Sequence, residues 1–341
     1  MMDWTDRHCR SFHRLLSRRA WLYTEMVTAQ AIAHGDLDHL LGRGEEGERV
    51  VLQLGGNDPQ LLARAAREGQ AYGYDEINLN CGCPSDRVRE GAFGACLMAE
   101  PERVADCVAA MQAVVQVPVT VKHRIGIDRR EDYEFVHRFV DVVAAAGCRR
   151  FVVHARNAWL DGLDPKQNRE IPPLRYEVVH RLAQDFPHCA FELNGGLQDL
   201  AHGLAAVCPE GAEDGRPATR LVGAMYGRRA YHDPWLLAGV DDWLARHAAE
   251  APVTDAAQPL TRAAVVEALV GYLERGAAHG VEVRHLARHV LGLYLGQPAA
   301  RLWRRMLSES RALSRNDPGL LREACAAVEA EAARVAQGRA D

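Results

Sequence analysis

The sequence predicts an α/β protein, a (β/α)8 TIM barrel, followed by an all-α helical bundle. Seven short apolar runs alternate with longer helical patterns over the first 248 residues. This alternation is typical of a parallel sheet with right-handed helical crossovers. The runs are predominantly apolar, as expected for strands that are buried on both faces. After residue 259 the pattern is helical only, which predicts a separate C-terminal bundle.

The predicted strands are short. They cover residues 21–24, 50–54, 76–79, 117–121, 150–154, 190–193 and 221–225. An eight-stranded barrel needs one more strand, whose place would be before Met1. Seven strands alone would leave two unpaired edges, which closed barrels avoid. We therefore expect that the chain as written lacks the first strand of its barrel.

Helical patterns fill the segments between these strands and the C-terminal region. The predicted helices cover residues 59–72, 102–115, 132–146, 176–185 and 197–207 in the barrel, and 262–279, 282–295, 299–313 and 318–335 in the bundle. Residues 249–259 are rich in Ala, Pro and Asp, which suits a linker. The predicted domains are therefore a catalytic barrel over residues 1–248, this linker, and a helical domain over residues 260–341.

The composition argues against several classes of protein. An apolar fraction of 48% and a charged fraction of 26% are ordinary for a globular protein, and no run of about 18 apolar residues predicts a membrane helix. The nine cysteines are odd in number and none are spaced Cys-x-x-Cys, which argues against a zinc ribbon and a disulfide framework. We expect a cytoplasmic monomer without a metal ion.

The charge is unevenly distributed. The whole chain carries −5, but residues 284–315 contain seven arginines and a single acidic residue, Glu309. A basic face on an acidic protein is typical of a local phosphate-binding surface. A solvated helix face is the simpler interpretation of an arginine cluster in general.

Residues 80–85, with the sequence Asn-Cys-Gly-Cys-Pro-Ser, are the most informative stretch of the chain. They follow the apolar run at 76–79, so the turn that they predict lies at the end of a buried strand. Such a turn would hold the Cys83 side chain out into a cleft. A free cysteine thiol, with a pKa of about 8.5, keeps its proton at neutral pH and is able to donate it to a developing carbanion.

Polar or glycine-rich groups follow six of the predicted strands, where the active site of a (β/α) barrel lies. In chain order they are Gln53, Asn80 with Cys83, Lys122 with Arg124, His154 with Arg156, Asn194-Gly195-Gly196, and Gly227-Arg228. A single one of these is more often a surface or structural residue, but together they predict a site. The glycines after the last two strands let backbone N–H groups approach a phosphate.

The remaining groups suit a flavin mononucleotide (FMN). Lys122 and His154 would lie near the middle of the barrel mouth, where a cation stabilises negative charge on a reduced flavin ring. Gln53 would hydrogen-bond the edge of a planar heterocycle.

The chain resembles the tRNA-dihydrouridine synthases of the A type over essentially its whole length. The stretches that carry this resemblance are residues 1–7, 22–26, 51–56, 78–85, 91–95, 122–126, 153–156, 168–173 and 194–196. Position 81 departs from the family pattern, because a small apolar residue is usual where this chain has Cys81. Cys81 is best interpreted as a packed small hydrophobic residue.

The resemblance implies roles for individual residues. The residues implied to bind FMN are Met1, Gln53, Lys122, His154, Asn194, Gly195, Gly196, Gly227 and Arg228. Cys83 is implied to be the proton donor, and Asn80, Lys166, Arg169, Arg301 and Arg304 to face the tRNA. The implied enzyme is an oxidoreductase that acts on a CH–CH bond. Hydride would pass from FMN to C6 of a uridine in the D-loop of tRNA, a proton would pass from Cys83 to C5, and NADPH would re-reduce the flavin.

Two other functions stay open from the sequence. One is another FMN barrel that acts on a small pyrimidine-like substrate, such as a dihydroorotate dehydrogenase, although a small substrate does not need an arginine-rich helical domain. The other is a tRNA-binding protein without catalysis, although binding alone does not need a thiol in the pocket. No Gly-x-Gly-x-x-Gly fingerprint directly follows a predicted strand, because the one match to this spacing, at residues 42–47, lies before the strand predicted at 50–54. NADPH would therefore bind over the flavin and not in a domain of its own.

Overall fold

The chain forms two compact units in a computed structural model that describes residues 1–85, 91–208, 221–247 and 259–337. The barrel unit consists of Met1–Met2, Tyr23–Gly42 and Glu48–Gly227. The helical unit consists of Asp3–Leu22, Arg43–Gly47 and Arg228–Asp341. Apart from residue 259, the linker predicted at 249–259 lies outside the described residues.

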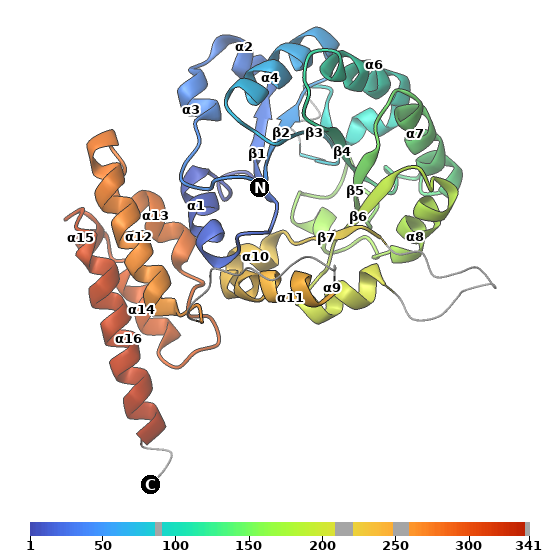
Figure 1. The fold of residues 1–341 in the computed structure, drawn as a ribbon. Coiled ribbons are helices and arrows are strands. Elements are labelled where there is room, and N and C mark those ends of the chain that lie inside the picture. Colours follow the sequence, from blue (N-terminus) through green and yellow to red (C-terminus); the bar gives the residue numbers. More distant parts are fainter. Residues whose placement is uncertain (86–90, 209–220, 248–258, 338–341) are drawn as a thin grey trace. The chain divides into compact units, whose positions relative to one another are not determined.

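The barrel unit is built on a curled parallel sheet of seven strands in the order β1 to β7, so the predicted fold class is confirmed. Figure 1 shows the strands surrounded by helices. The strands are β1 (Leu22–Thr28), β2 (Val50–Gly55), β3 (Glu76–Cys81), β4 (Val119–Arg124), β5 (Arg150–His154), β6 (Ala190–Asn194) and β7 (Gly223–Met225). Strand β3 is longer than predicted because Asn80 and Cys81 pair with Lys122 and His123 of β4.

Short polar signals position the helices of the barrel unit. Asp58, Asp132 and Asp199 each cap a helix N-terminus by accepting hydrogen bonds from backbone N–H groups. The helices are α2 (Ala29–His34), α3 (Leu37–Leu41), α4 (Pro59–Ala71), α6 (Pro101–Gln112), α7 (Tyr133–Ala145), α8 (Tyr176–Asp185) and α9 (Leu200–Val207), with the 3-10 segments η1 (Gly94–Ala99) and η2 (Gln167–Arg169). The sequence did not predict α2 and α3, because fewer than two turns give no readable helical period.

Alternation along the strands separates two environments. On β3, Ile77, Leu79 and Cys81 belong to the core between sheet and helices. Successive strand residues point to opposite faces, so Glu76, Asn78 and Asn80 point into the barrel. The same alternation turns Lys122, Arg124, His154 and Asn194 inward, while Val121, Val153 and Leu193 join the outer core. The interior of this barrel is therefore markedly polar at the carboxyl ends of its strands.

The helical unit contains more helices than the sequence predicted. Its elements are α1 (Arg7–Leu16), α10 (Arg228–His232), η3 (Pro234–Gly239), α11 (Val240–His247), α12 (Arg262–Gly276), η4 (Ala277–His279), α13 (Val283–Val290), α14 (Ala300–Met306), α15 (Ser310–Leu313) and α16 (Gly319–Gln337). The single helix predicted over 299–313 is two helices, α14 and α15. Helix α1 packs against α13 and α12 and buries Cys9, Phe12 and Leu16. None of the helices in the described part of the chain is long and apolar enough to cross a lipid bilayer.

Candidate active site

The turn after β3 presents the Cys83 thiol. The side-chain oxygen of Asn80 accepts hydrogen bonds from the backbone N–H groups of Gly82 and Cys83, each at 3.0 Å. This closed turn directs the half-buried Cys83 away from the strand, and its Sγ lies 3.3 Å from Ser85 Oγ. Cys81, by contrast, is fully buried, and burial raises the pKa of its thiol well above its usual value. The strand end thus separates a packed thiol from an accessible one.

Pairing between the strands brings several predicted site residues together. Asn80 lies opposite Lys122, and His154 lies between Arg124 and Asn194. The Asn80 amide also donates to the Gln53 side-chain oxygen at 2.8 Å. These residues come from five consecutive strands, β2 to β6, and all point into the barrel at its carboxyl end.

The electrostatics of this region differ from one residue to the next. Burial, with Arg124 nearby, lowers the pKa of Lys122 to about 8. Burial also lowers the pKa of His154 well below its usual value, and Arg124 and Lys122 add to this effect. His154 is therefore a neutral imidazole at pH 7, and of the two residues expected to supply a cation only Lys122 does so.

Arg124 is a buried cation that holds loops together. Its guanidinium donates to the backbone carbonyls of Gly82 at 3.1 Å, Asn157 at 3.2 Å and Asn168 at 2.9 Å. These bonds tie the Cys83 turn to the long segment at residues 157–173. Burial lowers the pKa of Arg124 to about 10, which leaves it charged at neutral pH.

The glycine pair after β6 forms a close-packed cradle. Gly195 and Gly196 have φ angles of +121° and +69°, which side chains rarely adopt. A Cβ at Gly195 would lie 2.8 Å from the His154 ring, and a Cβ at Gly196 would lie 2.4 Å from Leu174. Tyr176 fixes the loop by donating to the Gly195 carbonyl at 2.5 Å. Asn194 donates to the Met225 carbonyl at 2.9 Å and links this cradle to β7.

The other predicted residues fall in three places. Met1 and Gly227 lie close together in the barrel unit, where a Cβ at Gly227 would be 3.7 Å from the Met1 sulfur. Lys166 and Arg169 are exposed at either end of η2, and Asn168 between them is completely buried. The predicted residues of the helical unit are Arg228, which opens α10, and Arg301 and Arg304, which are exposed on α14.

Three residues at this site were not predicted from the sequence. Asn78 and Thr120 lie inside the barrel below Gln53 and Asn80. The sequence feature that could have indicated them is the presence of a polar residue within each of these mainly apolar strands. Tyr176 lies at the start of a helix, and its contact with Gly195 left no signal in the sequence.

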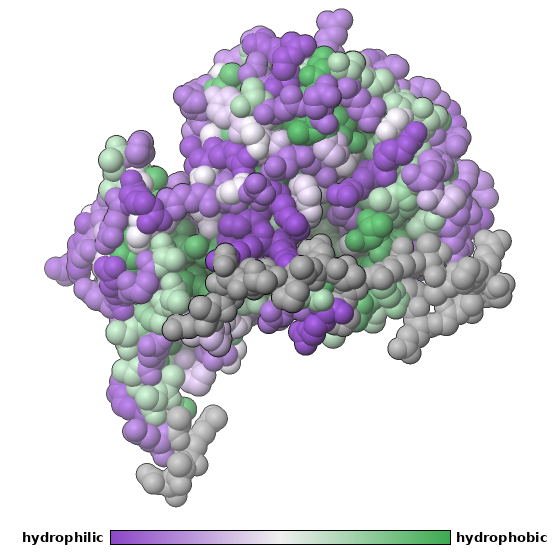
Figure 2. All heavy atoms as spheres, viewed as in Figure 1, coloured by the Kyte–Doolittle hydropathy of each residue, from purple (hydrophilic) through white to green (hydrophobic). Residues whose placement is uncertain are grey.

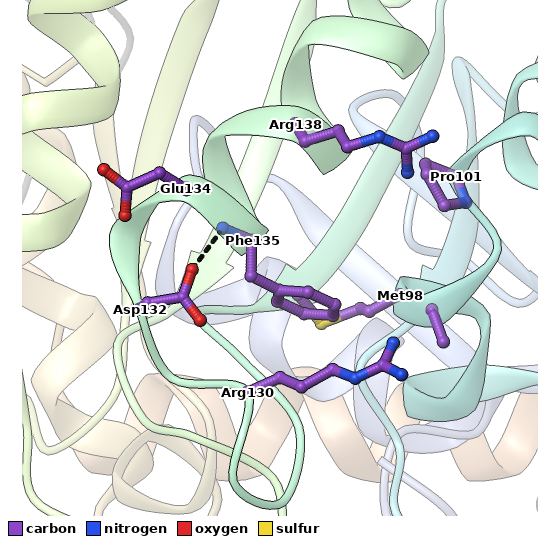
Figure 3. Close-up of a pocket in the computed structure, with 8 residues that line it drawn as sticks. Met98, Pro101, Arg130, Asp132, Glu134, Phe135 and Arg138 are labelled. Carbon is purple, nitrogen blue, oxygen red and sulfur yellow. Dashed lines mark hydrogen bonds between the residues drawn. The ribbon is translucent and has the colours of Figure 1, made fainter.

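An open pocket of about 460 Å³ lies elsewhere in the barrel unit. It is lined by Met98, Ala99, Pro101, Arg130, Asp132, Glu134, Phe135 and Arg138. Figure 3 shows Arg130 and Arg138 on either side of Phe135, with Asp132 bonded to the start of α7. None of the predicted site residues lines it, and it holds no thiol, so the strand-end residues are the better candidate.

The surface of the barrel unit is mostly polar. Hydrophilic residues cover most of its visible face, and apolar residues form only small separate patches (Figure 2). Among the described residues, no group of three or more His, Cys, Asp or Glu side chains is placed to hold a metal ion.

The family model for dihydrouridine synthases matches residues 1–332. The chain belongs to the dihydrouridine synthase family. A tRNA-dihydrouridine(20/20a) synthase of Synechocystis sp. is 51% identical over 331 residues, which are 95% of this chain and 91% of that protein. Two proteins of the same name are also 51% identical. The one from Salmonella typhimurium matches over 95% of this chain and 92% of its own length, and the one from Escherichia coli K12 over 91% of this chain and 84% of its own length. The family resemblance predicted from the sequence is confirmed.

One prediction concerns the charge of Lys122. Because its pKa falls from the usual 10.5 to about 8, the folded protein releases this proton at a lower pH than the unfolded chain does. The unfolded state then binds more protons between about pH 8 and 10.5, so this residue makes stability rise with pH in that window. Urea unfolding of the wild type and of Lys122→Met should show a free-energy difference that increases in favour of the wild type from pH 8 upward. A constant difference across this window would contradict the assignment.

Proposed function

We propose that this protein is a tRNA-dihydrouridine(20/20a) synthase, which reduces the C5=C6 bond of a uridine in the D-loop of tRNA. The observation that carries the proposal is the half-buried Cys83 thiol, held at the strand ends within electrostatic range of Lys122. The relatives of this name, which match 91–95% of the chain, support it.

The residues present fit FMN, and the family is flavin-dependent in general. The cradle at Gly195 and Gly196, which a Cβ would fill, admits a group that approaches the backbone closely. Gln53 supplies an amide edge and Lys122 a positive charge. Met1, His154, Asn194, Gly227 and Arg228 complete the proposed set of FMN-binding residues.

When bound, reduced FMN supplies the hydride that adds to C6 of the uracil ring, with NADPH as the proposed source of reducing equivalents. The thiol of Cys83 donates its proton to C5, so that one hydride and one proton together saturate the double bond. Gly82 and Cys83 occupy both lone pairs of the Asn80 oxygen, and Gln53 takes one of its two N–H donors. Asn80 therefore keeps one N–H for the substrate base while it positions the acid.

The uridine must leave its stack to reach this site, which costs a few kcal/mol and is easiest in a loop. Lys166 and Arg169 are the proposed phosphate contacts of the barrel unit. In the helical unit, Trp303 is completely buried and donates to the Val290 carbonyl at 2.8 Å. This anchor turns Arg301 and Arg304, three residues apart, onto the exposed side of α14.

Visible absorption of the purified protein tests the proposal. A flavin band that NADPH bleaches and unmodified tRNA restores is the expected result, with dihydrouridine detected in the product by mass spectrometry. A colourless protein that still binds tRNA would overturn the enzymatic assignment and favour a binding protein.

Replacing Arg301 and Arg304 together by alanine should raise the KM for tRNA and weaken its dependence on salt. Each lost phosphate contact reduces the slope of log K against log[salt] by roughly 0.7–0.9, so the pair should reduce it by about 1.5. The matched control is Arg322→Ala with Arg334→Ala, because these exposed arginines of α16 are ion-paired with Glu267 and Glu331. Equal effects of the two double variants on KM would place the tRNA surface elsewhere.

A further inference from the structure

A line of buried polar side chains runs from the Cys83 turn down into the barrel. Asn80 donates to Gln53 at 2.8 Å, and Gln53 donates to Asn78 at 2.9 Å. Asn78 donates to the Thr120 hydroxyl at 2.9 Å, and this hydroxyl donates to the Glu76 carboxylate at 2.6 Å. Gln53, Asn78, Thr120 and Glu76 are all at most 8% exposed.

The two ends of this line have fixed and complementary polarity. At the upper end, the backbone N–H groups of Gly82 and Cys83 are able only to donate, and they fill the Asn80 oxygen. At the lower end, the Glu76 carboxylate accepts from Thr120 and Tyr23 and lies 3.4 Å from Arg150. Burial raises the pKa of Glu76, while the hydrogen bond from Thr120, the Arg150 cation and the hydrogen bond from Tyr23 oppose this and favour the ionised form. The ionised carboxylate is able only to accept. The groups between the two ends must therefore donate in one direction, toward Glu76.

The direction of each bond decides the orientation of the amides above it. If Thr120 offers its proton to Glu76, its oxygen accepts from Asn78, and the Asn78 oxygen must then face Gln53. Gln53 in turn presents its oxygen to Asn80, and the Asn80 oxygen is left for the turn that carries Cys83. Branched apolar residues usually fill the interior of such a barrel. A line of polar side chains in their place destabilises the fold unless every member is hydrogen-bonded, because each unpaired member carries a desolvation cost.

We propose that Asn78 and Thr120 are positioning residues. Through them, the acceptor Glu76 sets the direction of the hydrogen bonds made by Gln53 and Asn80 and thereby the orientation of the Cys83 turn. Neither reaches the reacting atoms. Their effect is to fix which edge the Gln53 amide presents to the mouth of the barrel and to keep the Asn80 oxygen bonded to the turn. The role of Cys83 in this inference rests on the proposed function, but the geometry of the line does not.

Two pairs of variants isolate the Thr120 hydroxyl. Thr120→Val replaces the hydroxyl by a methyl group of similar size, and Thr120→Ala differs from Thr120→Ser only by the hydroxyl oxygen. If the Thr120→Val variant does not fold, the comparison of Thr120→Ala with Thr120→Ser still tests the inference.

The first readout is the rate at which iodoacetamide alkylates Cys83, followed by mass spectrometry with the half-buried Cys189 as internal reference. Loss of the hydroxyl should release the turn and speed alkylation of Cys83 by at least about threefold in both pairs, whereas Thr120→Ser should stay close to the wild type. An unchanged or slower rate in the variants without the hydroxyl would overturn the inference.

The second readout is the split between kcat and KM in dihydrouridine formation. The variants without the hydroxyl should lower kcat at least about fivefold and leave the KM for tRNA within twofold, because the proposed phosphate contacts lie on other elements. A change in KM alone would overturn the inference. If the wild type makes no dihydrouridine, the proposed function fails, and the alkylation rates, which need neither tRNA nor flavin, still decide whether the line positions the turn.

Discussion

Cys83→Ala is expected to lower the rate of dihydrouridine formation by about 10²–10⁴-fold, the usual contribution of a positioned general acid. The thiol is half-buried after the end of β3, and the substitution removes only its sulfur atom. The turn itself should persist, because it depends on the Asn80 oxygen and on backbone N–H groups. Affinity for tRNA should be unchanged, and single-turnover kinetics with filter binding would measure both quantities.

Cys81→Ala is the matched control for this experiment. Cys81 is two residues away but is completely buried in the core behind the sheet, with the pKa of its thiol raised by burial. We expect this variant to lose about 1 kcal/mol of stability through the small cavity and to keep its catalytic rate. Full activity of Cys83→Ala, or loss of activity in Cys81→Ala alone, would move the proton donor away from Cys83.

Gly195→Ala is expected to abolish flavin binding and to destabilise the barrel unit. The φ angle of +121° is strained for any residue with a side chain, at a cost of about 1–3 kcal/mol. The added Cβ would also lie 2.8 Å from His154 and 3.0 Å from Leu174, so the cradle must open or the imidazole must move. The ratio of flavin to protein absorbance and a urea unfolding curve would measure the two effects.

Gly162→Ala separates backbone strain from crowding. Gly162 also has a positive φ, +84°, but a Cβ there would have no atom within 4 Å. Its alanine variant should therefore lose some stability and keep its full flavin content. If both variants retain flavin equally, the Gly195 cradle is not part of the cofactor site.

The strand pattern of the barrel was predictable because it depends on local features. Fully buried parallel strands are continuous apolar runs, and aspartates such as Asp58 and Asp132 mark the helix starts directly in the sequence. The residues at the strand ends were predictable for the same reason, since every parallel strand brings its last residue to the same edge. Cys83, Lys122, His154 and Asn194 were found in this way.

Features that depend on distant packing were not predictable. Helix α1 lies near the N-terminus, and its packing partners α12 and α13 lie more than 200 residues away along the chain. Arg124 was visible as a polar residue at a strand end, but its three carbonyl acceptors come from three separate loop positions. Contacts between residues that lie far apart in the chain cannot be read from a single sequence.

The sequence by itself determined the order of the strands, the position of the Cys83 turn and the family of the protein, because each depends on residues that are neighbours in the chain. Tertiary structure decided how these groups behave. It made His154 neutral and lowered the pKa of Lys122, since burial and surrounding cations act through space. It also joined Asn80 to Glu76 through three intervening side chains, because the direction of a hydrogen bond is set only when donor and acceptor meet.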